Sequence, residues 1–269
     1  MPRSISKYLM ETNIVINGDC QKILPTFPEK SIDLVITSPP YAEKRKKAYG
    51  GIPANQYKDW LLTVSIEIMR VLKDEGSFIL NIKEGCTKGV RDTYVLEYLL
   101  EMSKKYLWID TFIWYKTNPF PTGAKNRLKD AWEYCFHFSK TKKYKFYPNS
   151  VSKSSNSKWT NENRKNKGAF STKNGSGMNM SHRIISNLVR PSNVLHGSKS
   201  CTNVSHPAVF PPYIPSFFIN LLSKPGDIIL DPFAGSGTTL HVAKQCERKY
   251  IGIEVSVPYV TLIEKILGE

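Results

Sequence analysis

Residues 226–239 read GDIILDPFAGSGTT, and this stretch decides the fold of the chain. Its apolar residues predict a short buried strand that ends in Asp231, and a helix is expected to begin at Thr238. Gly235 and Gly237 let the turn between them pass close to a ligand, because glycine has no Cβ to clash with it. In open α/β sheets, ligands bind just beyond the carboxyl ends of the strands, so this turn predicts a binding site.

The residues after this turn indicate what kind of ligand it binds. The next expected strand, 250–255, ends in Glu254, seventeen residues after Gly237, and an acid there can accept hydrogen bonds from both hydroxyls of a ribose. The turn has no lysine after Gly237 to hold a phosphate, and it lacks the third glycine of the dinucleotide motif. A nucleoside without a pyrophosphate needs neither feature, so the pattern predicts a nucleoside-type cofactor.

A second motif, Ser38-Pro39-Pro40-Tyr41, follows a buried-strand pattern at residues 31–37. The Ser38 hydroxyl and the Pro39 carbonyl can supply two hydrogen-bond acceptors side by side, and the two prolines fix the direction of that carbonyl. Such acceptors would draw the hydrogens of a base amino group out of plane and localise its lone pair. Tyr41 offers a ring on which a flipped-out base can stack.

Alone, the second motif would favour a polyproline-like turn. Beside the Asp231 turn it predicts an amino-group site, and we expect the two motifs to face each other across a single sheet.

Strand and helix patterns alternate on both sides of a dissimilar central stretch. This alternation predicts right-handed βαβ units in an α/β fold, with a Rossmann-like, doubly wound, mostly parallel sheet. The expected strands are 13–18, 31–37, 76–82, 107–116, 131–140, 226–231 and 250–255. The expected helices are 21–27, 55–73, 93–106, one within 206–226, 238–247 and 258–268.

The central stretch, residues 140–205, is rich in Ser, Asn, Lys and Gly, and it predicts an inserted, loop-rich lobe. Between Lys140 and His206 there are thirteen Lys and Arg residues and one acid, Glu162, so this stretch carries +12 of the net charge of +15. Charge this one-sided predicts a polyanionic partner, and we favour nucleic acid over a solvated basic tail. The candidate DNA-binding residues are Lys158, Arg164, Lys165, Lys167, Lys173, Arg183 and Arg190.

The composition excludes several other classes of protein. No apolar run could span a bilayer and the N-terminus has no apolar signal core, so a soluble, cytoplasmic protein without membrane partners is expected. The five cysteines are scattered and form no C-x-x-C, which argues against a disulfide framework and a structural zinc site. No metal site is predicted.

Together the two motifs resemble those of the DNA amino-methyltransferases that use S-adenosylmethionine. In that family a [D/N/S]-P-P-[Y/F/W] motif is catalytic and a D-P-F-x-G-S-G-T loop binds the cofactor. The order of the motifs, with a basic insert between them, resembles the β group, over most of residues 13–139 and 206–265. The resemblance implies a class I methyltransferase fold and catalytic roles for Ser38, Pro39, Pro40 and Tyr41.

The resemblance also implies a set of cofactor contacts. Asp19 resembles the family's polar contact to the cofactor's adenine, and the segment around Pro207 resembles the cover over its methionine end. Lys116 and Asn118 are looser matches to residues that line the base pocket. The implied cofactor-binding residues are Asp19, Pro207, Ala208, Phe210, Asp231, Phe233, Ala234, Gly235, Ser236, Gly237, Thr238 and Glu254. Residues 1–139 and 206–269 would form the catalytic and cofactor-binding domain, and 140–205 the target-recognition insert.

The family associates Ser-Pro-Pro-Tyr mainly with the N4 amine of cytosine and Asp-Pro-Pro-Tyr with the N6 amine of adenine. We favour a site-specific, cytosine-N4 methyltransferase, but either amine needs the same two acceptors, so an N6-adenine enzyme stays open. Methylation of cytosine carbon 5 is not expected, because no cysteine here follows a proline. An RNA substrate and a non-catalytic DNA-binding subunit are weaker alternatives, since the chain has no RNA-binding module and keeps both motifs.

Three partners follow from this interpretation. Double-stranded DNA is the expected substrate. A cognate restriction endonuclease, in a restriction-modification system and not in a stable complex, is implied by the resemblance alone. Family members are often dimers, but no feature of this chain compels a homodimer, so the oligomeric state stays open.

Overall fold

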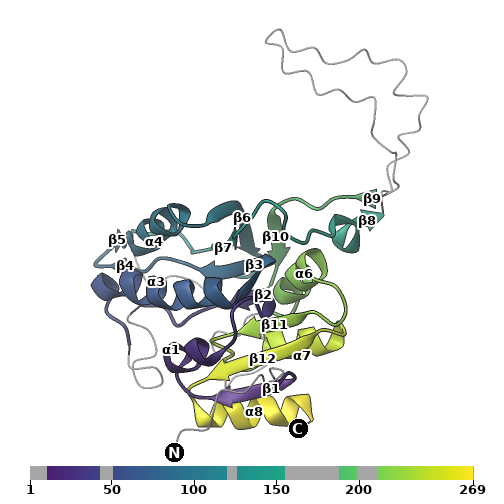
Figure 1. Cartoon of the computed structure of the whole chain (residues 1–269). Coiled ribbons are helices and arrows are strands. Elements are labelled where there is room, and N and C mark those ends of the chain that lie inside the picture. The colour runs from purple at the N-terminus through teal and green to yellow at the C-terminus, as the bar shows by residue number, and fades with distance from the viewer. Residues whose placement is uncertain (1–10, 43–50, 120–125, 155–187, 199–210, 269) are drawn as a thin grey trace, which may run out of the picture.

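An eight-stranded sheet forms the centre of the computed structural model (Figure 1), which describes residues 11–42, 51–119, 126–154, 188–198 and 211–268. In spatial order the strands are β1 (Ile14–Asn17), β12 (Lys249–Glu254), β11 (Ile228–Asp231), β2 (Ile32–Thr37), β3 (Leu72–Ile82), β7 (Trp132–Ser139), β6 (Leu107–Lys116) and β10 (Val194–Gly197). Among these strands, β7 alone runs antiparallel to its neighbours. The predicted α/β fold with a mostly parallel sheet is confirmed.

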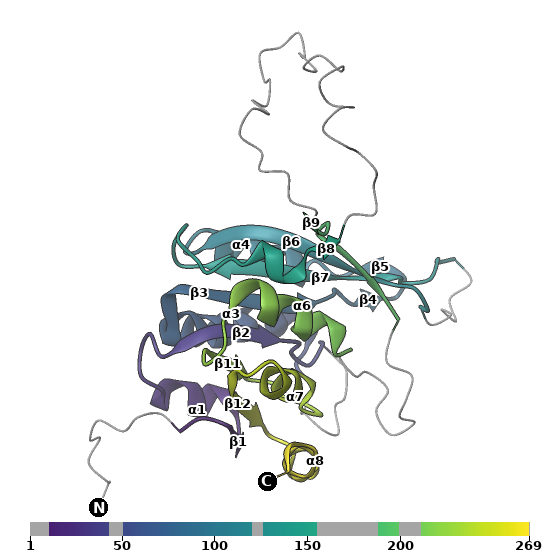
Figure 2. The same ribbon diagram turned by 90° about the vertical axis from the view of Figure 1, so that its right-hand side faces the viewer.

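Helices cover both faces of this sheet (Figure 2). One buried core lies under α1, α3 and α4, and the other lies under α6, α7 and α8. The helices are α1 (Cys20–Ile23), η1 (Leu24–Thr26), α3 (Ala54–Val71), α4 (Tyr94–Ser103), η2 (Pro148–Val151), α6 (Tyr213–Leu222), α7 (Thr238–Gln245) and α8 (Val257–Leu267). Short strand pairs join β4 (Cys86–Thr87) to β5 (Val90–Arg91), and β8 (Lys153–Ser154) to β9 (Leu188–Val189).

The central strands are apolar because both of their faces are covered. Every residue of β2 is buried, as expected for a parallel strand between two helical layers. In β3, Phe78 and Leu80 enter the first core and Ile79 enters the second, since successive side chains point to opposite faces of a strand.

Local sequence signals set several helix ends. The Asp19 side chain accepts a hydrogen bond from the Gln21 amide, which caps the first turn of α1. Pro258 lies in the first turn of α8, where its missing N–H has no helical partner to lose, and Gly268 ends the helix with a φ of +75°.

The chain reverses its winding direction between two adjacent strands. It leaves β11 through α7 towards β12, and it leaves β2 through α3 towards β3, so the two crossovers move apart from the β11–β2 pair. Asp231 ends β11 and Thr37 ends β2, at the same edge of the sheet. A reversal of this kind is where open α/β sheets bind their ligands.

Parts of the predicted insert pack against the sheet. Strand β10 pairs with β6 at one edge. The Lys145 ammonium lies 2.7 Å from a carboxylate oxygen of Asp33 and 2.8 Å from one of Asp227, and both carboxylates are buried. The division into a catalytic domain and an insert at 140–205 stays a prediction, because residues 155–187 and 199–210 lie outside the described residues.

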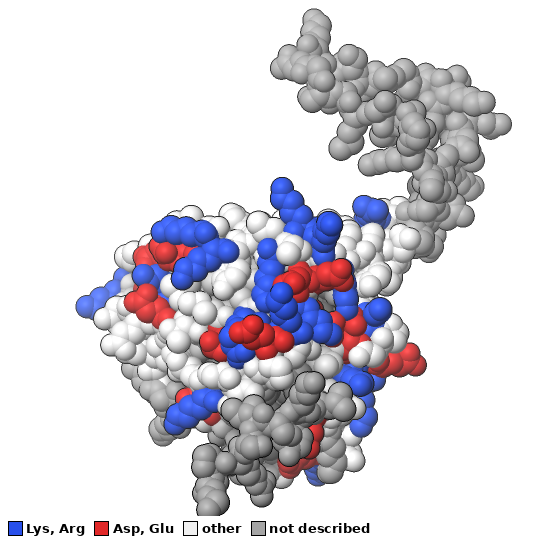
Figure 3. Space-filling model, viewed as in Figure 1, with Lys and Arg blue, Asp and Glu red and all other residues white. Residues whose placement is uncertain are grey.

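Charged side chains on the described surface are mixed in sign. On the face drawn in Figure 3, Lys and Arg side chains are interspersed with Asp and Glu side chains. Seven of the thirteen Lys and Arg residues between Lys140 and His206 lie outside the described part of the chain. Within that described part, no helix is long and apolar enough to cross a membrane.

Candidate active site

The two sequence motifs meet at the carboxyl edge of the β11–β2 pair. The Thr37 hydroxyl donates a 2.6 Å hydrogen bond to Oδ1 of Asp231, although the two residues are 194 positions apart. Thr37 is 1% exposed and Asp231 is 4% exposed, so solvent does not compete for this bond. The expectation that the motifs face each other across one sheet is therefore confirmed.

Asp231 is a buried carboxylate held by several donors. Besides Thr37, the Phe233 amide donates to its Oδ1 at 3.1 Å. Burial raises the pKa of Asp231 to about 6, and hydrogen bonds from Thr37, Thr239 and Phe233 limit the rise. A cationic ligand group beside it would stabilise the ionised form.

The two positions of the turn are glycine for different structural reasons. Gly237 has a φ of +81°, and a Cβ there would lie 2.8 Å from the Ile263 side chain of α8, so only glycine fits against that helix. Gly235 has a φ of +54°, and the nearest atom to its added Cβ would be the Phe233 carbonyl oxygen, 3.9 Å away. The space over Gly235 is thus open, as a ligand-facing turn requires.

Glu254 is tied to this turn by its side chain. Its Oε2 accepts a 2.8 Å hydrogen bond from the Gly235 amide, and its Oε1 accepts one of 2.8 Å from the Ser256 amide. The carboxylate is 2% exposed. Two carboxylate oxygens have about four acceptor positions, more than these two bonds use.

Asp19 lies at the end of β1, beside the same edge, and is connected to the turn through Trp60 of α3. The Gln21 side-chain oxygen accepts a 3.2 Å hydrogen bond from the Trp60 indole, whose ring centroid lies 5.5 Å from that of Phe233. Trp60 lies within the expected helix 55–73 and was not predicted to belong to the site. The signal available in the sequence was a single tryptophan within that expected helix.

The Ser38–Tyr41 corner follows β2 directly. The Pro40 carbonyl accepts a 2.9 Å hydrogen bond from the Tyr57 hydroxyl, which fixes the corner to α3. Among the described residues, none donates to the Pro39 carbonyl oxygen. That Ser38 Oγ and the Pro39 carbonyl oxygen both accept from a base amine stays a prediction.

A buried ion pair lies behind Tyr41. The Tyr41 hydroxyl donates a 2.7 Å hydrogen bond to Oε2 of Glu133 in β7, and the Lys116 ammonium at the end of β6 donates to Oε1. Burial raises the pKa of the Tyr41 phenol well above its ordinary value, and the Glu133 charge adds to that rise. Sequence reasoning missed Glu133, whose only signal is a single acid inside the aromatic run 132–138.

Several predicted residues have no described position. The cofactor contacts Pro207, Ala208 and Phe210 lie outside the described residues, as do the DNA contacts Lys158, Arg164, Lys165, Lys167, Lys173 and Arg183. Arg190 is described and exposed, one residue after β9. Within the described ranges, no three His, Cys, Asp or Glu side chains lie where they could hold a metal ion.

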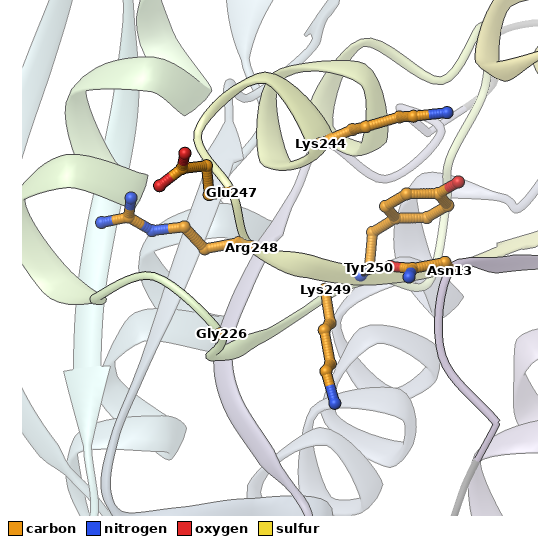
Figure 4. A pocket seen from close by; sticks show the side chains of 7 residues that line it. All are labelled: Asn13, Gly226, Lys244, Glu247, Arg248, Lys249 and Tyr250. Carbon is orange, nitrogen blue, oxygen red and sulfur yellow. Dashed lines mark hydrogen bonds between the residues drawn. The ribbon is translucent and has the colours of Figure 1, made fainter.

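A separate hollow of about 460 Å³ opens at the opposite, amino edge of the sheet (Figure 4). Its side chains point in different directions, and two of its three cations are engaged: Arg248 bonds to Ser223, and Lys244 to the Leu267 carbonyl. It lies at the start of β12, whereas Glu254 ends that strand. This hollow is not part of the site. Its lining residues are Asn13, Gly226, Lys244, Glu247, Arg248, Lys249 and Tyr250.

Comparison with known proteins gives consistent matches. The family model for N6 and N4 methyltransferases, described as DNA methylase, matches residues 32–265. Type II methyltransferase M.PvuII of Proteus hauseri is 32% identical over 268 residues, which cover 90% of this chain and 80% of that protein. Type II methyltransferase M.HinfI of Haemophilus influenzae is 29% identical over 285 residues, which cover 100% of this chain and 71% of that protein.

Solved structures agree with the sequence matches. The structure of PvuII DNA methyltransferase (cytosine-N4-specific) has a TM-score of 0.72 at 30% identity, covering 94% of this chain and 85% of that one. The putative DNA modification methylase TTHA0409 of Thermus thermophilus, solved in complex with S-adenosyl-L-methionine, has a TM-score of 0.63 at 23% identity, covering 95% of this chain and 93% of that one. At 23% identity, the similarity to TTHA0409 supports the fold alone.

Proposed function

Because the chain belongs to the DNA methylase family of N6 and N4 methyltransferases, we propose that it transfers a methyl group from S-adenosylmethionine to the N4 amine of a cytosine in double-stranded DNA. The observation that carries this proposal is the Thr37–Asp231 hydrogen bond, which brings the Ser-Pro-Pro-Tyr corner and the glycine turn to one edge of the sheet. Cofactor and base would then meet between them.

The residues present fit S-adenosylmethionine. Asp231 is a buried carboxylate whose ionised form a cationic ammonium would favour, and Glu254 is a buried carboxylate at the end of β12, of the kind that accepts from ribose hydroxyls. Asp19 lies beside them, and the open space over Gly235 would admit the ligand. The further contacts in this proposal are Phe233, Ala234, Ser236, Gly237 and Thr238, with Pro207, Ala208 and Phe210.

The chain's own contribution to the chemistry is to hold the amino group. Ser38 Oγ and the Pro39 carbonyl oxygen accept hydrogen bonds from its two N–H groups, which localises the nitrogen lone pair. Tyr41 stacks on the flipped base and fixes it in the corner; stacking of this kind contributes about 1–3 kcal/mol. When bound, S-adenosylmethionine supplies a methyl group activated by its sulfonium, so direct in-line displacement needs no covalent enzyme intermediate.

Cytosine is the proposed base for two reasons. The corner begins with Ser38 rather than an aspartate, and a structural relative with 30% identity over 94% of this chain is a cytosine-N4-specific enzyme. The N6 amine of adenine is the second candidate, because the same two acceptors would serve it and the family includes both chemistries.

The DNA, the partners and the location are parts of the same proposal. The basic residues of 140–205 would contact DNA phosphates and recognise the target sequence. Several relatives are type II methyltransferases, so we place the protein in a restriction-modification system with a cognate endonuclease that is not stably bound. A protein that methylates the DNA of the cell would be located in the cytoplasm. A homodimer is compatible with the proposal and is not required by it.

Labelled methyl transfer tests the proposal. Purified protein, unmethylated double-stranded DNA and S-adenosylmethionine with a labelled methyl group are incubated, and the DNA is digested to nucleosides. Label in N4-methyldeoxycytidine is the expected result. Label in N6-methyldeoxyadenosine would overturn the choice of base. In a parallel incubation with RNA, label in RNA but not in DNA would overturn the substrate.

A non-catalytic DNA-binding subunit would behave differently. It would bind DNA but show no calorimetric heat with S-adenosylmethionine and place no label in any nucleoside. That pair of results would replace the enzyme by a binding protein.

A further inference from the structure

The backbone torsions of the Ser38–Tyr41 corner are restricted by its sequence, with one exception. The proline rings fix φ of Pro39 and of Pro40. A residue that precedes a proline is confined to extended ψ values, which restricts ψ of Ser38 and of Pro39. The torsion ψ of Pro40 is not restricted in this way, because Tyr41 and not a proline follows it. This torsion sets the direction of the Pro40 carbonyl and of the planar peptide that leads to Tyr41.

A buried tyrosine of α3 restrains this remaining torsion. The Pro40 carbonyl oxygen can only accept, so the Tyr57 hydroxyl donates the 2.9 Å hydrogen bond between them. Tyr57 is 0% exposed, and its ring centroid lies 4.8 Å from that of Tyr94 and 5.3 Å from that of Trp60. A donor packed in this way cannot follow the carbonyl if it turns, so the bond holds the carbonyl in one direction.

Tyr41 is therefore held at both of its ends. Its backbone follows the Pro40 carbonyl that Tyr57 holds, and its hydroxyl donates a 2.7 Å hydrogen bond to Oε2 of Glu133 in β7. Glu133 is 8% exposed and its other oxygen accepts from Lys116, so it is a fixed acceptor. With its two ends tied to different elements, the Tyr41 side chain is placed by the protein before any ligand binds.

We propose that Tyr57 is a positioning residue that fixes ψ of Pro40 and so holds the Tyr41 ring in place for the target base. This inference rests on the proposed function. Tyr41 is only partly buried, whereas Tyr57 has no exposed surface, so Tyr57 acts through Pro40 and not by touching the base. A ring that is already in position loses less conformational freedom when a base stacks on it, which leaves more of the stacking energy for binding.

Kinetics of two isosteric variants test the role. Tyr57→Phe removes the donor and keeps the ring, and should lower kcat/KM for methylation of an unmethylated plasmid about tenfold, because part of the stacking on Tyr41 is lost. Its calorimetric affinity for S-adenosylmethionine should stay within about twofold of wild type. The matched control is Tyr98→Phe, since Tyr98 is equally buried and its hydroxyl lies 2.7 Å from Oγ of Ser65. Both variants should lower the Tm to a similar extent, but the control should keep the wild-type kcat/KM. Equal kcat/KM values for the two variants would overturn the proposal.

A double variant tests whether Tyr57 acts through the Tyr41 ring. Tyr41→Ala removes the ring and should lower kcat/KM for the same plasmid by roughly one to two orders of magnitude. Adding Tyr57→Phe to Tyr41→Ala should lower kcat/KM by less than about twofold more, because no ring is left to place, although the fall in Tm should persist. A tyrosine that is merely structural would lower kcat/KM equally in both backgrounds. Losses that multiply would therefore overturn the proposal.

The position of the ring can also be observed without turnover. Crystal structures of the wild type, Tyr57→Phe and Tyr98→Phe should show the Tyr41 ring displaced in Tyr57→Phe alone. A Tyr41 ring in the same place in all three would overturn the proposal, whatever the methylation result. A wild type that transfers no label to DNA would instead overturn the proposed function, and with it the role of the ring in base binding, even where Tyr57→Phe displaces that ring.

Discussion

At the scale of single residues, Asp231 combines a folding cost with a binding role. Burial raises its pKa from an ordinary 3.8 to about 6. The folded protein therefore binds the Asp231 proton more tightly than the unfolded chain does. The stabilisation from this group is complete below about pH 4 and is lost as the pH rises through about 6. At neutral pH the ionised carboxylate therefore lowers stability by about 3 kcal/mol, an order-of-magnitude figure.

Asp231→Asn should remove this cost. The amide oxygen can still accept from Thr37 and Phe233, and no charge is buried. We expect a higher Tm than wild type at pH 8 and no difference at pH 4, measured by thermal denaturation without cofactor. The same variant should bind S-adenosylmethionine more weakly by calorimetry. A pH-independent difference in Tm would contradict the assignment of the raised pKa.

Replacing Ser38 should lower the rate of methyl transfer and leave the affinity for S-adenosylmethionine unchanged. Ser38→Ala removes one of the two acceptors for the amine, and loss of one preorganised transition-state hydrogen bond costs about 10²–10³ in kcat. Calorimetric affinity for S-adenosylmethionine should stay within about twofold of wild type, since Ser38 lies on the β2 side of the edge. An unchanged kcat would show that the hydroxyl takes no part.

Sequence and structure differ in what they reveal at this scale. Asp231 and Ser38 could be predicted because each stands in a motif whose chemistry depends on local order along the chain. Glu133 could not be predicted, because its hydrogen bond with Tyr41 depends on which β7 residue lies behind that tyrosine. That proximity arises from the packing of β2, β3 and β7, which no local pattern contains.

At the scale of elements, the glycine turn between β11 and α7 joins packing to binding. Gly237 lets the start of α7 lie against Ile263 of α8, whereas Gly235 faces open space. The two glycines look equivalent in the sequence, and only the position of α8 separates their roles.

Alanine at each glycine should divide its effect differently between stability and cofactor binding. Gly237→Ala combines a left-handed backbone with a Cβ only 2.8 Å from Ile263, and should cost about 3 kcal/mol of unfolding free energy. Gly235→Ala should cost about 1 kcal/mol for its backbone alone, but should weaken S-adenosylmethionine binding more. Urea denaturation and calorimetry measure both quantities. Equal losses of stability would contradict this division.

Most elements were predictable from periodicity. The expected helix 55–73 is α3, and the aromatic run at 131–140 is β7, as its β-favouring residues indicated. Strand β10 was not predicted, because four residues inside a Ser- and Asn-rich stretch give no periodic signal. It pairs with β6 at the edge of the sheet, a contact that no local pattern in the sequence contains.

At the scale of the whole molecule, the sheet unites two segments far apart in the chain. Strand β2 pairs with β11, so the catalytic corner near one end and the glycine turn near the other share an edge. The basic stretch between these segments carries most of the net charge. An enzyme arranged in this way would hold DNA with the insert and carry out transfer at the sheet.

The salt dependence of DNA binding should report on this stretch. Neutralising Arg164, Lys165 and Lys167 together should reduce the slope of log affinity against log salt by about 3, if each residue meets one phosphate. The control neutralises Lys104, Lys105 and Lys249, exposed residues at the amino edge of the sheet, and should leave the slope unchanged. Equal slopes for both triple variants would place DNA elsewhere.

The most direct measurement is sequencing that reports modified bases, on DNA from cells that express the wild-type protein or Ser38→Ala. The account predicts N4-methylcytosine at one short recognition sequence with the wild type, and its loss with the variant. Unmodified DNA from wild-type cells, or equal modification in both, would contradict the claim that the serine corner and the aspartate turn form one methyl-transfer site.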